Sequence, residues 1–121
     1  ATIAFDDDLT SVVIDGKNCK LPPHKNEHLF CRAAFQYKKS EPIDWSIISE
    51  EMTGKQWGES ADEGAKKDKR AVMDTMYAIN KRIAEVVNTE DQLFVWNEKT
   101  VTRMFYSIES IDFPLIQRVE K

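Results

Sequence analysis

Apolar residues recur at helical spacing between residues 66 and 87, in the stretch KKDKRAVMDTMYAINKRIAEVV. The steps between them are four, three, four and three, which places them on one face of a helix. These apolar positions are Val72, Met76, Ile79, Ile83 and Val86. The opposite face carries long polar side chains, namely Lys67, Arg70, Asp74, Tyr77 and Lys81. The pattern therefore predicts a helix over about 67–87, with one buried stripe and one face open to solvent or a partner.

The first 21 residues alternate between strand-like runs and turn residues. Runs at 2–5 and 11–14 are typical of strands, and 17–21 follows with alternating polarity. Asp15-Gly16 separates the last two runs, and Asp-Gly is a frequent two-residue hairpin turn. We therefore expect an antiparallel β-meander over 1–21.

Two shorter helices are predicted between this meander and the long helix. The first follows Pro22-Pro23, since proline suits the first turn of a helix, and it continues to about residue 38. Its apolar stripe consists of Leu29, Phe30, Ala33, Ala34 and Tyr37. The second is predicted to begin after Asp44 as N-cap and to stop at Gly54. Its inward residues are expected to be Ile47, Ile48 and Met52.

Two β-type runs follow the long helix, at 93–96 and 100–106, around the turn Asn97-Glu98-Lys99. Residues 107–121 show no clean period and form an extension. Three helices closed by a C-terminal hairpin form a winged helix-turn-helix. We therefore predict an α+β winged-helix domain over 1–106, with its sheet at 1–21, its helices within 22–91 and its wing at 92–106.

Four segments resemble the OmpR/PhoB-type winged-helix effector domains. VVIDGKNCKLP resembles their opening sheet, IDWSIISEEM their second helix, AVMDTMYAINKRI their recognition helix and LFVWNEKTVTRMF their wing. The resemblance covers about residues 2–105 and lies in pattern more than in identity. It implies a long helix in the DNA major groove and a wing on the DNA backbone. Asn80 stands where the family usually has arginine, and the wing offers Asn97, Lys99 and Arg103 in place of its glycines and first arginine.

Composition suits a single soluble domain. The chain has 121 residues, of which 41% are apolar and 31% charged, as in ordinary globular proteins. No apolar run approaches the roughly 20 residues that a membrane span needs, so we expect no membrane insertion. Cys19 and Cys31 are too few for a disulfide framework and favour a reducing cytoplasm. The net charge of −4 argues mildly against nucleic acid, although clustering of cations on one face matters more.

The outward face of the long helix has the chemistry of a major-groove reader. Arginine can pair bidentately with guanine, and lysines can neutralise phosphates. We predict double-stranded DNA as the partner, contacted by Lys67, Arg70, Asp74, Tyr77, Lys81, Arg82, Lys99 and Arg103. The alternative for the helix is a solvated face with internal pairs such as Arg70–Asp74 and Lys81–Glu85. For the hairpin, the alternative is exposed cross-strand charge.

Trp57 is unusual in the polar loop GKQWGES. In the resembled family this loop can contact RNA polymerase or another partner, and aromatic residues suit interfaces. The alternative is that Trp57 packs back onto its own domain.

No metal, cofactor or catalytic site is predicted. His24 and His28 are four positions apart and Cys31 lies one turn further on, but the spacing matches no common zinc pattern. The sequence contains no glycine-rich phosphate loop, nucleophile elbow or histidine with an evident acidic partner. We therefore do not expect an enzyme.

The sequence favours a cytoplasmic DNA-binding transcriptional regulator domain, used as a homodimer on repeated half-sites. The alternative is a winged-helix module for protein–protein interaction, which the acidic balance, Asn80 and the altered wing favour. A shared positive face would favour DNA, and an even scatter of charge would favour the interaction module.

Overall fold

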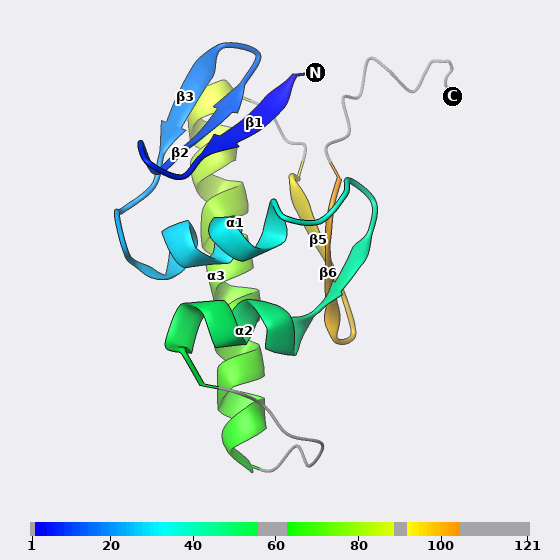
Figure 1. The fold of residues 1–121 in the computed structure, drawn as a ribbon. Coiled ribbons are helices and arrows are strands. Elements are labelled where there is room, and N and C mark those ends of the chain that lie inside the picture. Colours follow the sequence, from blue (N-terminus) through cyan, green and yellow to red (C-terminus); the bar gives the residue numbers. More distant parts are fainter. Residues whose placement is uncertain (1, 56–62, 89–91, 105–121) are drawn as a thin grey trace, which may run out of the picture.

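The computed structural model describes residues 2–55, 63–88 and 92–104. Figure 1 shows an N-terminal sheet, three helices and a C-terminal pair of strands. The architecture is α+β, with two small antiparallel sheets, and this coarse class is as predicted. The loop residue Trp57 and the extension 107–121 lie outside the described residues.

The N-terminal sheet has the strand order β1-β2-β3. Its strands are β1 (Ile3–Asp6), β2 (Ser11–Ile14) and β3 (Lys17–Lys20). Val12 in the middle strand lies opposite Phe5 on one side and Cys19 on the other. Asp15 and Gly16 have φ values of 50° and 83°, the positive pair that a type I′ hairpin turn requires. The predicted meander is confirmed.

Helix α1 (Asn26–Ala34) ends earlier than predicted, and an unpredicted strand follows it. The sequence indicates only a helix breaker at Pro42, but this residue begins β4 (Pro42–Asp44). Proline is tolerated at the first position of an edge strand because its missing N–H is not needed there. Strand β4 pairs with residues of the distant hairpin, Ile43 lying opposite Val101, and this partner could not be inferred from the local pattern.

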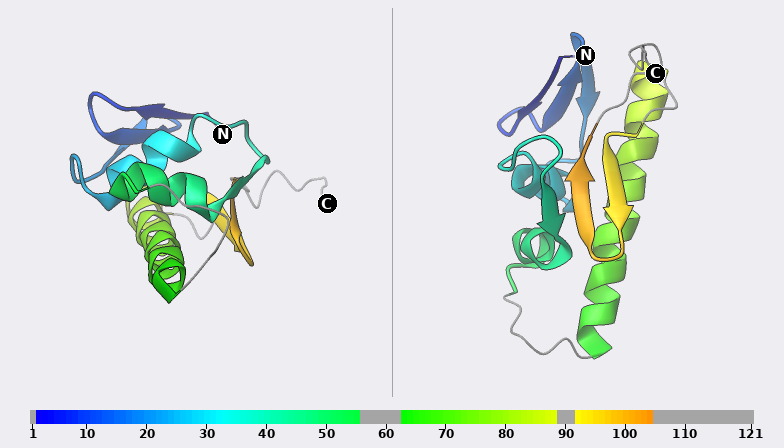
Figure 2. Two further views of the ribbon diagram at one scale, coloured as in Figure 1. Left: turned by 60° about the horizontal axis from the view of Figure 1, so that its bottom comes forward. Right: turned by 90° about the vertical axis from the view of Figure 1, so that its right-hand side faces the viewer.

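The predicted C-terminal hairpin is confirmed as β5 (Phe94–Asn97) and β6 (Thr100–Arg103). With β4 it forms the second sheet, in the order β4-β6-β5. The backbone N–H of Trp45 donates to the Lys99 carbonyl at 2.8 Å and thereby ties the hairpin turn to the start of α2. In Figure 2 (right) the hairpin runs alongside the long helix α3 (Glu63–Val87).

Helix α2 (Trp45–Thr53) has the predicted caps. The Asp44 carboxylate accepts from the Ser46 N–H at 3.1 Å, and Gly54 closes the helix with a φ of 74°. Ile48 is buried as predicted and Met52 packs at the margin of the core, but Ile47 is exposed, so that prediction is wrong. Trp45, Ile48 and Ser49 form the buried face instead, at the i, i+3 and i+4 spacing of a helix.

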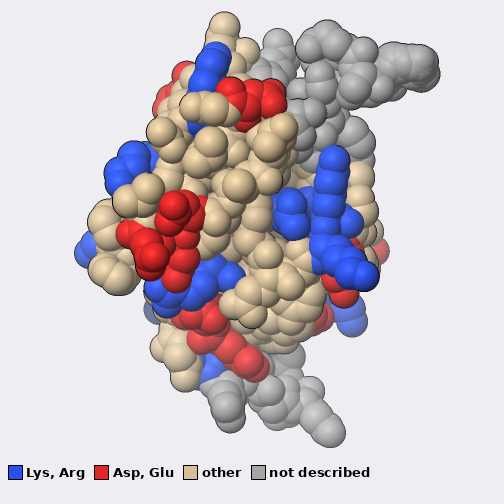
Figure 3. Space-filling model, turned by 45° about the horizontal axis from the view of Figure 1, so that its top comes forward, with Lys and Arg blue, Asp and Glu red and all other residues tan. Residues whose placement is uncertain are grey.

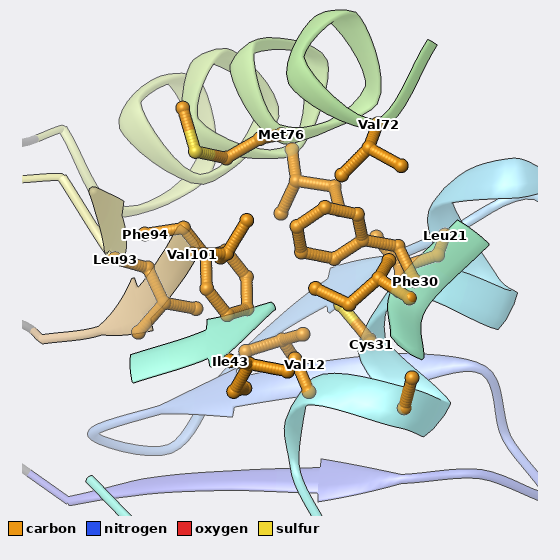
Figure 4. Close-up of a cluster of buried hydrophobic side chains, with 14 of the residues drawn as sticks. Val12, Leu21, Phe30, Cys31, Ile43, Val72, Met76, Leu93, Phe94 and Val101 are labelled. Atoms are coloured by element: carbon orange, nitrogen blue, oxygen red, sulfur yellow. The ribbon is translucent and has the colours of Figure 1, made fainter. Parts of the chain in front are cut away.

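Helix α3 supplies the centre of the core, as Figure 4 shows. Val72, Met76, Ile79 and Ile83 are buried as predicted, whereas Val86 is 40% exposed. The neighbouring Val87 packs against the core instead. Phe30 from α1 and Phe94 from β5 meet edge to face, with ring centroids 5.0 Å apart, so one aromatic contact joins the helices to the second sheet.

Candidate nucleic-acid interface

The outward face of α3 carries the polar residues predicted for it, all of them exposed: Lys67, Arg70, Asp74, Tyr77 and Lys81. Because the apolar stripe is buried on the other side, the predicted phase of the helix is correct. Arg70 Nε lies 3.2 Å from Asp74 Oδ1, the pair expected for a solvated face. Both side chains are largely exposed, so this ion pair is weak and Arg70 remains available to a stronger anion.

Arg82 is used inside the domain. Its guanidinium donates from Nε to Glu27 Oε1 at 2.7 Å and from Nη2 to Glu27 Oε2 at 3.0 Å. This two-point bond raises the pKa of Arg82 and connects α3 to the first turn of α1. The sequence predicts Arg82 as a phosphate contact, but the structure places it in a partly buried link between two helices.

Arg103 also turns toward its own domain. Its Nη2 donates to the Tyr37 carbonyl at 2.8 Å, and its guanidinium carbon lies 4.5 Å from the centre of the Phe35 ring. Burial lowers the pKa of Arg103. Within the described residues its Nε has no hydrogen-bond partner. The sequence predicts Arg103 as a DNA contact in the wing. In the structure its side chain instead packs the loop after α1 onto β6.

Asn80, a residue of α3, is buried against β5. Its side-chain amide donates to the Phe94 carbonyl at 2.9 Å, and its amide oxygen accepts from the Phe94 N–H at 3.1 Å. The amide thus satisfies two backbone groups at the open edge of β5, as a neighbouring strand would. This residue positions the hairpin against α3 and is not available to a base.

The N-terminal half of α3 carries two further cations, Lys66 and Lys69, that are not among the predicted contact residues. An open hollow of about 240 Å³ lies between this part of the helix and the hairpin, lined by Lys66, Lys69, Arg70, Met73, Trp96 and Glu98. Lys99 is exposed at the hairpin turn beside Glu98. The spacing of the lysines and Arg70 places them close together on the helix, but only the tertiary structure brings the hairpin beside them.

Charge is distributed unevenly along α3. Lys66, Lys67, Lys69 and Arg70 lie within five positions, and the single acid among them, Asp68, lies 3.7 Å from Lys55. The C-terminal half is mixed, since Arg82 is bound to Glu27 and Glu85 is exposed near Lys81. Figure 3 shows basic and acidic side chains in small mixed groups on the face it presents. The basic end of α3 is therefore the part with the charge that a nucleic acid requires.

The histidines and cysteines weighed as metal ligands have other partners. His28 Nδ1 accepts from the His24 N–H at 2.9 Å, and His28 Nε2 lies 2.6 Å from Asp7 Oδ1. Cys19 and Cys31 are buried, and burial raises the pKa of both thiols. No group of three or more potential metal ligands occurs in the parts of the chain described by the structure.

Comparison with protein-family models, curated proteins and solved structures found no match for this chain. Within residues 2–55, 63–88 and 92–104, no helix combines the length and apolar character needed to cross a bilayer.

Proposed function

We propose that this chain is a winged helix-turn-helix domain that binds double-stranded DNA through the basic end of α3 and the tip of the β5–β6 hairpin. The observation that carries the proposal is the group of three cations, Lys66, Lys69 and Arg70, that lines the hollow beside the hairpin. A helix fits the major groove, and a hairpin at its side can reach the adjacent backbone.

The sheet order supports the winged-helix assignment. A short strand between the first two helices pairs with the C-terminal hairpin, and this holds the hairpin next to the long helix. In Figure 1 the N-terminal turns of α3 extend past α2. At 25 residues, α3 is about 37 Å long, and its exposed row runs along the helix from Lys67 to Lys81.

The proposed contact set differs from the one that the sequence alone predicts. Lys67, Arg70, Tyr77, Lys81 and Lys99 remain, with Lys66 and Lys69 added. Asp74 takes part by holding Arg70, or by accepting from a cytosine amine. Arg82 and Arg103 are left out because both are bound within the domain.

The proposal is tested by fluorescence anisotropy with a duplex selected from a random pool and with a scrambled duplex, each at two salt concentrations. We expect binding that weakens as salt rises, because each neutralised phosphate releases counterions. Arg70→Ala should weaken binding of the selected duplex about tenfold, within the range for a lost bidentate base contact, and should affect the scrambled duplex less. Lys17→Ala is the control, since Lys17 is an exposed lysine at the start of β3 in the distant meander.

The second candidate is a protein–protein interaction module. The overall charge of −4 favours it, as does Tyr77, whose side chain is 51% exposed on the same face. Absence of binding to either duplex at low salt would exclude the DNA proposal and leave this one. Homodimerisation, a partner at the Trp57 loop and a cytoplasmic location remain predictions from the sequence.

A further inference from the structure

Strand β5 has an edge with which no other strand pairs among the described residues, since the second sheet has the order β4-β6-β5. Leu93, just before β5, accepts from the Met104 N–H at 2.7 Å on the β6 side. The next residue, Phe94, turns the other way, because its N–H and carbonyl both bond to the Asn80 side chain. These directions alternate along an antiparallel strand, so the N–H and carbonyl of Trp96 also point away from β6. At Trp96 the edge therefore presents a backbone donor and acceptor to which a further strand could bond.

The helix face beside this edge is basic. The hollow between α3 and the hairpin is lined by Lys66, Lys69, Arg70, Met73, Trp96 and Glu98. The four residues from α3 lie within eight positions at steps of three, one and three, so they share one side of the helix. Three cations face a single lining acid, Glu98, which gives the hollow a positive character. Asp74, the partner of Arg70, is not among the lining residues.

Side chains of an added strand would be directed toward these cations. Trp96 and Phe94 project from the same face of β5, because side chains two positions apart share a face. Phe94 is buried in the core and Trp96 packs at its margin, so this face is the one turned toward α3. Every second side chain of a strand paired with Trp96 would project from the same face, next to Lys69, Arg70 and Met73.

Charge and hydrogen bonding distinguish the possible occupants of the edge. A second copy of this chain would bring its own basic helix face to the same place, and like charges repel. A nucleic acid backbone supplies phosphate acceptors for the Trp96 N–H but leaves the Trp96 carbonyl without a donor. An extended peptide supplies both backbone groups, and its carboxylates complement the cations.

We propose that the β5 edge at Trp96 and the adjacent hollow bind an extended peptide by strand addition. One face of this peptide carries acidic side chains for Lys69 and Arg70 and an apolar side chain for Met73 and the Trp96 ring. The hollow overlaps the surface proposed for DNA, but the peptide inference does not rest on DNA binding.

The test is an NMR titration of the isotopically labelled 121-residue chain, without DNA and at constant ionic strength. The probe is the peptide acetyl-Asp-Thr-Val-Thr-Asp-Thr-Asp-amide, whose alternate residues are acidic or apolar. We expect a saturable downfield shift of the Trp96 amide, as a new hydrogen bond produces, together with a shift of the Met73 methyl. The Lys17 amide in the distant meander should not move.

Two altered peptides separate pairing from charge. The peptide with its three central N–H groups methylated keeps the carboxylates but cannot donate to a strand edge, so we expect no saturable shift. The peptide with asparagine in place of each aspartate keeps the backbone, and its Kd should be about fivefold higher, as for the loss of exposed ion pairs.

A pair of chain variants locates the charge contact. Lys69→Gln removes a cation of the hollow and should raise the Kd of the acidic peptide about two- to fivefold. Lys17→Gln, the same change on the exposed meander, is the control and should leave the Kd unchanged.

Equal binding of the methylated peptide would overturn strand addition, and equal binding of the asparagine peptide would overturn the charge requirement. A Trp96 amide that shifts on dilution of the chain alone would assign the edge to a second copy instead. Because no DNA is present, a chain that binds the peptide and no duplex refutes only the DNA proposal, and the reverse result refutes only this one.

Discussion

Three polar side chains illustrate what decides a residue's role in this domain. Arg82, Arg103 and Asn80 bond to Glu27, Tyr37 and Phe94, which lie 55, 66 and 14 positions away in the chain. Considered along the sequence, each is a polar residue on an exposed helix or hairpin. In the fold, each one satisfies a buried or partly buried group, and an unsatisfied partner there would be costly.

Asn80→Ala should lower the free energy of unfolding markedly. The substitution leaves the N–H and carbonyl of Phe94 without partners, at about 1–3 kcal/mol for each buried group. Urea denaturation measures the change. Gln36→Ala, which removes an exposed amide, should stay within about 0.5 kcal/mol of the original chain. Similar midpoints for the two variants would contradict the structural role of Asn80.

The bond between Asp7 and His28 predicts a stability that depends on pH in the acid range. The His28 hydrogen bond, with help from Arg32, holds the pKa of Asp7 below its ordinary value of 3.8. A lowered folded pKa stabilises the native state at pH values above the unfolded pKa, and the gain disappears as pH falls through the folded pKa.

Asp7→Asn, which keeps an oxygen for His28, should therefore be less stable than the original chain by a constant amount at neutral pH. The difference should shrink as the pH falls below about 4. Thermal unfolding of both proteins from pH 7 to pH 3 checks this, and a difference that does not change with pH would disprove it.

At the level of elements, amphipathic periodicity located α3 and its phase, because burial of one face is a property of neighbouring turns. The same periodicity also predicted Val86 to be buried, but Val86 is exposed near the end of the helix. Strand β4 was missed because three residues that begin with proline carry no β-signal by themselves. Its pairing partner, β6, lies on the far side of α3 in the sequence.

Met76→Ala and Ile79→Ala should each cost roughly 2–5 kcal/mol of unfolding free energy, as large-to-small substitutions in a packed core do. Val86→Ala, in the same helix but exposed, should cost well under 1 kcal/mol. Guanidinium denaturation of the three variants compares buried and exposed positions on one helix. Equal costs would show that the phase of α3 is wrong.

For the molecule as a whole, the exposed row of α3 and the hairpin form one candidate surface, while the buried stripe of the long helix packs into the domain. Neighbouring residues on α3 therefore have different expected roles. Lys81 is exposed, whereas Arg82 is joined to Glu27.

Lys81→Ala should weaken binding to selected and scrambled duplexes about equally and reduce the salt slope by about one unit, as expected for one phosphate contact. Arg82→Ala should lower stability and leave the salt slope unchanged, provided that the protein is folded. Anisotropy titrations across a salt series, together with a melting curve for each variant, separate the two effects. A reduced salt slope in Arg82→Ala would show that this arginine also contacts phosphate.

The sequence by itself determined the features that depend on neighbouring residues. Periodicity predicted the buried stripe of α3 and its exposed row, Asp15-Gly16 the hairpin turn, and Asp44 and Gly54 the ends of α2. Tertiary structure alone decided which cations stay exposed, how β4 joins the hairpin, and which residues line the hollow beside the hairpin. The physical reason is the distance along the sequence between the residues that interact. Caps, turns and helix faces follow from residues a few positions apart. The fate of a polar side chain depends on a partner brought close only by folding.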